Sequence, residues 1–130
     1  MTPYLAALLY SLPKRNECVF SSPRQVSTPY LSEPRYAHNR ACQAAGIEGL
    51  SLHGLRRSFG TLAEWVEAPV GVVAQIMGHK PSALAEKHYR RRPLDLLRLW
   101  HTKIEGWILE QAGIPQPAED AAPGKLRAVK

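Results

Sequence analysis

The sequence has 130 residues and is 45% hydrophobic, which fits one globular domain and excludes two independent ones. Its formal net charge of +6 favours contact with a polyanion, either nucleic acid or an acidic membrane surface. No apolar run reaches the roughly 20 residues needed to cross a bilayer, and the N-terminus carries no secretory signal. We therefore expect a soluble, cytoplasmic protein in which Cys18 and Cys42 are free thiols.

Capping and breaker residues divide the first half of the chain into three short elements. They predict a helix over residues 3–12, a short strand at 18–20 and a helix over 33–45. Thr2 is the expected cap of the first helix, and Ser32 is that of the second. Gly46 suits the left-handed conformation that ends this second helix.

The second half of the chain is predicted to be helical, with turns at Pro and Gly. The expected helices cover residues 52–68, 70–77, 82–89 and 94–111. Ser51 can cap the first of them. From Gly113 onward the sequence has many breakers and no periodicity, which predicts a domain over 1–112 and a disordered tail over 113–130. The predicted fold is therefore mainly α, with at most one short strand.

The expected helix over 94–111 carries an apolar stripe. Its members, which recur at helical spacing, are Leu97, Trp100, Ile104 and Trp107. Such a stripe must be buried, either against the body of the same chain or on a neighbouring protomer. The sequence leaves both arrangements open.

Basic residues gather between Lys80 and Arg92, where five of them stand against one acid, Glu86. The five are Lys80, Lys87, Arg90, Arg91 and Arg92. Such a cluster either contacts the phosphates of a nucleic acid or forms a solvated helix face, and composition alone does not decide between the two.

His53 and Arg56 are three positions apart at the start of the helix that Ser51 caps, so their side chains share one face. A helix N-terminus attracts anions, an Arg fork can grip the oxygens of a phosphate, and an imidazole can give or take a proton. The pair therefore suits phosphoryl transfer. The alternative interpretation is a capping His beside a surface Arg.

A longer pattern follows this pair along the chain. His79, preceded by Gly78, lies 23 positions after Arg56, and Tyr89 lies 10 positions after His79. This succession resembles the tyrosine recombinases, in particular the phage-type integrases. Their catalytic domains carry a His-x-x-Arg motif, then Gly-His, then a Tyr nucleophile at about these intervals. The resemblance covers nearly everything before the tail, and it implies the helical C-terminal part of such a catalytic domain.

The resemblance also implies a role for each motif residue. Tyr89 would be the nucleophile that forms a 3′-phosphotyrosyl link to DNA, and Arg56 would neutralise the scissile phosphate. His53 would move protons, and His79 would help to hold the phosphate. The further residues expected to bind DNA are Arg57, Lys80, Lys87, Arg90 and Arg91.

The implied reaction, DNA integration by strand cleavage and rejoining, needs no cofactor and no metal. The covalent intermediate keeps the phosphodiester energy, and the sequence has no carboxylate cluster that would bind magnesium. The implied partners are double-stranded DNA at attachment sites and other recombinase protomers, which would contact the helix over 94–112. No membrane partner is expected.

The family's active site also contains an arginine and a lysine that lie upstream of the segment resembled here, and neither has a counterpart in this chain. We therefore expect an incomplete catalytic domain that is inactive alone. The sequence does not decide whether this chain acts as an enzyme. The alternative function is a non-catalytic, basic helical DNA-binding module. A third possibility is a helical interaction protein whose basic cluster is merely solvated.

Overall fold

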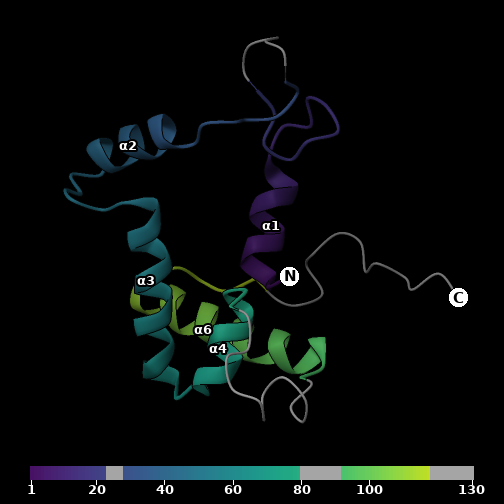
Figure 1. Ribbon diagram of the computed structural model, residues 1–130, viewed down its shortest axis with the longest axis vertical. Helices are drawn as coiled ribbons and strands as arrows, with labels where there is room; N and C mark the ends of the chain where they lie inside the picture. The colour runs from purple at the N-terminus through teal and green to yellow at the C-terminus, as the bar shows by residue number, and fades with distance from the viewer. Residues whose placement is uncertain (23–27, 80–91, 118–130) are drawn as a thin grey trace, which may run out of the picture. The chain divides into compact units, whose positions relative to one another are not determined.

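Helices dominate the structure. The computed structural model describes residues 1–22, 28–79 and 92–117. Its helices are α1 (Pro3–Ser11), α2 (Arg35–Ala44), α3 (Leu52–Leu62), the 3-10 helix η1 (Ala63–Val66), α4 (Val70–Ile76) and α6 (Leu94–Gln111), which Figure 1 labels except for η1. Within these ranges the β structure is limited to an isolated bridge between Ser21 and Tyr30. The expected fold, mainly α with at most one short strand, is confirmed.

The chain forms two compact units. The first, which we call the core unit, comprises Met1–Tyr10 and the residues from Ser58 onward. The second, which we call the corner unit, comprises Ser11–Arg57. Helix α3 begins in the corner unit and ends in the core unit, because the boundary falls within its length.

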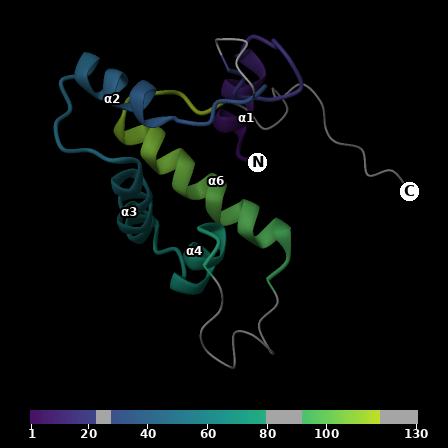
Figure 2. The same cartoon turned by 45° about the horizontal axis from the view of Figure 1, so that its top comes forward.

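The core unit is built around α6. Ile104 of α6 is completely buried, and the buried residues that surround it come from η1, the following turn and α4: Ala63, Val66, Ala68 and Val73. Figure 2 shows α4 lying beside α6, and both α4 and η1 contact this helix. Trp100 and Trp107 pack against the same cluster. Ile104 of the apolar stripe is therefore buried against its own chain, and Trp100 and Trp107 are partly buried there, which favours the first of the two arrangements that the sequence left open.

Helix α6 has the bounds that the sequence predicted. Pro93 precedes its first turn, and Gly113 follows its last turn with a φ of 66°, where an amide hydrogen bond from Ile114 to the Leu109 carbonyl closes the helix. Neither α6 nor any other helix in the described ranges has the apolar length to cross a bilayer.

Gln116 donates to the Thr102 carbonyl, so the chain folds back beside α6 at this point. The expected tail over 113–130 stays a prediction, since residues 118–130 lie outside the described ranges.

Helix α1 is attached to α6 by one carboxylate. Glu105 accepts hydrogen bonds from the amides of Tyr4 at 2.9 Å and Leu5 at 3.1 Å, and the Thr2 hydroxyl also donates to it. The cap that the sequence assigned to Thr2 is thus supplied by Glu105, roughly a hundred residues away along the chain. A capping carboxylate from a distant helix leaves no local sequence signal.

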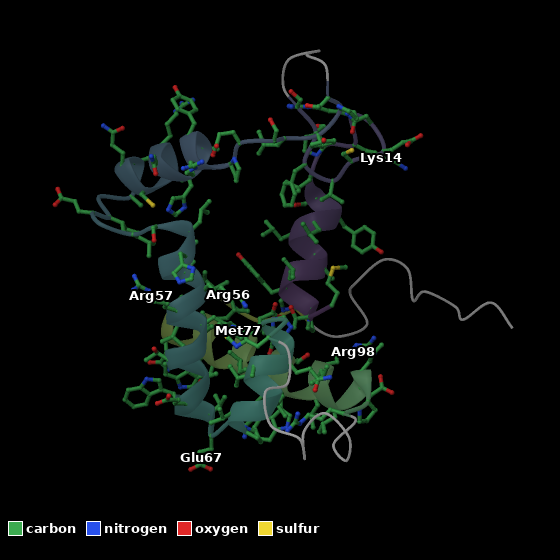
Figure 3. The ribbon with its side chains drawn as sticks, in the orientation of Figure 1. Lys14, Arg56, Arg57, Glu67, Met77 and Arg98 are labelled. Atoms are coloured by element: carbon green, nitrogen blue, oxygen red, sulfur yellow. The ribbon has the colours of Figure 1, made fainter. Side chains whose placement is uncertain are left out.

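The expected helix over 52–68 is wrong in its second half. The α-helical conformation ends at Leu62, and the chain tightens into η1 before Glu67 adopts a left-handed φ of 57°. Figure 3 labels Glu67 at this turn, before α4. In a 3-10 helix, side chains three apart stand above one another, so Ala63 and Val66 both face α6 and are buried there. Packing on α6 explains this change of geometry.

The corner unit has a different construction. The bridge near its start is closed by backbone hydrogen bonds from Ser22 to Pro29 and from Leu31 to Phe20. Helix α2 starts two residues later than predicted, after Pro34, and the carboxylate of Glu33 rather than Ser32 accepts from its first amide. Gly46 ends α2 with a φ of 67°, as expected. None of the described residues of this unit is buried.

Candidate functional site

The start of α3 has the capped geometry that the sequence predicted. The Ser51 hydroxyl accepts a hydrogen bond from the Gly54 amide at 2.9 Å, and the Ser51 carbonyl accepts from the Leu55 amide at 3.0 Å. A Cβ at position 54 would lie 3.3 Å from the same hydroxyl, so glycine leaves room for this cap. The cap fixes where the helix begins and which residues form its first turns.

His53 and Arg56 occupy these first turns of α3. Both are exposed, and their spacing of three residues places them on one helix face. Arg57 is exposed as well, but Figure 3 shows it extending to a different side of α3 from Arg56. The positive end of the helix dipole lies at the same place, so a phosphate approaching His53 and Arg56 would meet a favourable field.

His79 lies directly after α4. Gly78 ends the helix with a φ of 73°, and the His79 amide donates to the Ala74 carbonyl at 2.9 Å. The helix is itself held by Val72 and Val73, which are both buried in the core unit. The His79 imidazole is exposed after the end of α4, where an anion could reach it.

The candidate catalytic residues are divided between the two units. His53 and Arg56 belong to the corner unit, while His79 belongs to the core unit. Their gathering around one phosphate stays a prediction. Tyr89, the expected helix over 82–89 and the basic residues Lys80, Lys87, Arg90 and Arg91 lie outside the described residues.

The segment that contains Tyr89 is bracketed by two residues linked to α4. The His79 amide donates to the Ala74 carbonyl of this helix, and the Arg92 guanidinium donates to the side-chain oxygen of Gln75 on α4 at 3.4 Å. No local pattern in the sequence predicts the second link, because Gln75 and Arg92 are 17 positions apart. The sequence identifies Arg92 only as a member of the basic cluster.

A second contact that the sequence did not predict lies in the corner unit. The Nε2 atom of His38 on α2 is 2.9 Å from the Leu50 carbonyl oxygen, one residue before the Ser51 cap. The thiol of Cys42, one turn later on α2, lies 3.5 Å from the same nitrogen. Both cysteines are free, as expected.

The remaining histidine of the core unit is part of its packing. His101 of α6 meets the ring of Phe59 edge-on, with 5.6 Å between ring centroids, and its burial lowers the pKa of the imidazole. In the parts of the chain that the structure describes, His, Cys, Asp and Glu side chains form no group of three that could hold a metal ion. The expectation that the reaction needs no metal stays a prediction.

The chain is 61% identical over 121 residues to the prophage integrase IntF of Escherichia coli (strain K12). This chain is similar to part of a phage integrase. The match covers 88% of this chain and 26% of IntF, so the chain spans about a quarter of the length of that relative. Residues 53–89 stand more than 40 positions from either end of the chain, so the match to the integrase includes them. No protein-family model and no solved structure matches the chain.

Proposed function

We propose that this chain supplies part of the catalytic domain of a tyrosine recombinase, which integrates DNA by cutting and rejoining its strands. One observation carries the proposal: the chain is 61% identical to a prophage integrase over a stretch that includes His53, Arg56, His79 and Tyr89. The exposed His53 and Arg56 at the capped start of α3 support it, because this is a place where a phosphate can bind.

The proposed reaction begins with attack by the phenol oxygen of Tyr89 on the scissile phosphorus. The phenol loses its proton as a bond forms between its oxygen and phosphorus, the bond from phosphorus to the 5′ oxygen breaks, and the leaving oxygen takes up a proton as a 5′-hydroxyl. Arg56 offsets the negative charge of the pentavalent transition state. His53 moves protons, and His79 donates a hydrogen bond to the phosphate. Attack by a 5′-hydroxyl on the 3′-phosphotyrosyl link reverses these steps and rejoins the DNA.

The proposed partner is double-stranded DNA at attachment sites. Arg57, together with Lys80, Lys87, Arg90 and Arg91, would contact backbone phosphates, which gives an affinity that falls steeply with salt. Because the apolar stripe of α6 packs within its own chain, contact with other protomers would use the outer side of this helix. Leu94 and Leu99 of this helix are 77% and 64% exposed.

The chain alone is expected to have negligible recombination activity. The family's active site includes an upstream arginine and lysine that have no counterpart in this sequence. Each such group is worth roughly 10² to 10³ in rate, because each supplies charge stabilisation or a proton in the transition state. A test of the mechanism must therefore supply the other parts of an integrase.

The experiment replaces the matching quarter of the prophage integrase with this chain. The chimera is incubated with a nicked suicide DNA that carries the attachment sequence, and protein–DNA adducts are resolved by denaturing electrophoresis. We expect an adduct that disappears in Tyr89→Phe, because the variant lacks the nucleophilic oxygen. The matched control is Tyr36→Phe, which alters a tyrosine that is 70% exposed on α2 and should leave the adduct unchanged.

Two results would contradict this function. An adduct that persists in Tyr89→Phe would show that another residue is the nucleophile. If the chimera forms no adduct while this chain alone retains duplex DNA in a salt-dependent manner, the chain is the non-catalytic DNA-binding module that the basic cluster also allows.

A further inference from the structure

The contact between His38 and Leu50 has a defined direction. A carbonyl oxygen can only accept a hydrogen bond, so the Nε2 atom of His38 must carry the proton that it shares with Leu50 over 2.9 Å. His38 is half-buried and lies in the first turns of α2, while Leu50 lies in the loop that leads to α3. The hydrogen bond therefore ties α2 to the residue that immediately precedes the cap of α3.

The loop between α2 and α3 depends on this tie. It turns at Gly46 and Gly49, which have φ values of 67° and 70°, and its amide at Ile47 donates to the Cys42 carbonyl at 2.9 Å. These contacts fix the beginning of the loop. The His38 imidazole fixes its other end, at Leu50.

Packing offers little substitute for this hydrogen bond. All of these residues belong to the corner unit, in which none of the described residues is buried. Nearby, Leu52 and Leu55 are 40% and 46% exposed, so the first turns of α3 are not held by a local apolar core. Where apolar burial is small, an individual side-chain hydrogen bond determines more of the local geometry.

We propose that His38 is a positioning residue for the phosphate-binding end of α3. It donates to Leu50 and thereby sets the loop so that Ser51 caps the helix and presents His53 and Arg56 on one face. This role rests on the proposed function, in which those two side chains bind a scissile phosphate. His38 itself touches neither the phosphate nor the nucleophile.

The test uses the whole 130-residue chain and two substitutions of His38. His38→Leu removes the donor, whereas His38→Gln places an amide nitrogen at a similar reach and keeps it. Helix content is checked by circular dichroism, exchange of the Gly54 and Leu55 amides is followed by NMR, and affinity for a short DNA duplex is measured at low salt. The matched control is Glu33→Gln, which removes the charge from the exposed ion pair with Arg35 at the start of α2.

We expect His38→Leu to weaken binding of the duplex about fivefold, the effect of losing one ordinary hydrogen bond, and to speed exchange of the Gly54 and Leu55 amides. His38→Gln should restore both properties, and Glu33→Gln should change neither. The Nε2 proton of His38 should also give a slowly exchanging NMR signal in the wild-type chain. A role in general folding alone would not be rescued selectively by an amide donor.

The inference is overturned if His38→Leu leaves affinity and amide exchange unchanged, or if His38→Gln fails to restore them. Failure of the proposed function looks different. In that case the wild-type chain does not bind the duplex, or Arg56→Ala binds it as tightly as the wild type. Amide exchange in the His38 variants then still decides whether the imidazole holds the start of α3.

Discussion

The core unit and the corner unit are held together by different forces. In the core unit, Ile104 has no exposed surface, and residues of η1 and α4 enclose it. In the corner unit none of the described residues is buried, and the aromatic residues Phe20 and Tyr36 are 61% and 70% exposed. This unit relies on caps, glycine turns and single hydrogen bonds.

This difference affects the candidate site directly. Burial of apolar surface contributes about 25 cal/mol per Å², whereas a cap or one neutral hydrogen bond contributes about 1 kcal/mol. His79 follows a helix anchored by buried Val72 and Val73, so we expect its position to be the more firmly fixed. His53 and Arg56 depend on the Ser51 cap and on the His38 contact. We therefore expect the positions of His53 and Arg56 to be the more adjustable ones.

The largest effect is expected from truncating the centre of the core unit. Ile104→Ala should lower the free energy of unfolding by about 2–5 kcal/mol, because it removes a completely buried side chain and leaves a cavity. The measurement is denaturant unfolding followed by the fluorescence of the neighbouring tryptophans. Leu99→Ala on the same helix is the control, since Leu99 is 64% exposed and its loss should change stability by less than about 0.5 kcal/mol. Equal effects of the two substitutions would show that Ile104 is not the centre of the core.

A smaller effect within the core unit should depend on pH. Burial acts to raise the pKa of Glu105, but the hydrogen bonds from Thr2, from the amides of Tyr4 and Leu5 and from Gln116 outweigh it and hold the pKa below its usual value. A lowered folded-state pKa stabilises the protein fully above the unfolded-state pKa. That stabilisation is lost as the pH falls through the folded-state pKa.

Denaturant unfolding of the wild-type chain between about pH 6 and pH 3 measures this loss. We expect Glu105→Gln to flatten the pH dependence in the acidic part of this range, because the titrating group is gone. Glu110→Gln is the matched control, since Glu110 is exposed on the same helix. If Glu105→Gln keeps the wild-type pH dependence, another carboxyl group controls it.

The smallest and most local effect is expected in the corner unit. Ser51→Ala removes the acceptor of the Gly54 amide and should destabilise the start of α3 by about 1 kcal/mol. Amide hydrogen exchange should therefore become faster at Gly54 and Leu55 while the amides of α6 keep their protection. Uniform loss of protection along both helices would mean that the two units unfold together, which would remove the contrast between them.

The sequence predicted the elements whose causes are local. Pro93 and the apolar stripe defined α6 to the residue, and Ser51 capped α3 as expected. Gly46 and Gly78 ended their helices with positive φ angles because a glycine meets no steric penalty there. Of the site, the positions of His53, Arg56 and His79 at helix ends could be predicted in this way.

Features that depend on distant residues could not be predicted. The capping of α1 by Glu105 joins segments about a hundred residues apart, and the left-handed Glu67 follows from the packing of η1 on α6. The His38 contact with Leu50 crosses a loop whose path no local pattern defines. For the same reason, the sequence lists the residues of the proposed site without fixing their arrangement in space.

The most direct test asks whether one phosphate engages both units. The chain is labelled with ¹⁵N and titrated with a short DNA duplex while the imidazole signals of His53 and His79 are followed, with His101 as the internal control because it packs against Phe59. We expect both signals to shift with the same dissociation constant, and Arg56→Ala to raise that constant for both, while His101 does not move. A shared phosphate site would be contradicted if the His53 and His79 signals give different dissociation constants, or if Arg56→Ala leaves these constants unchanged.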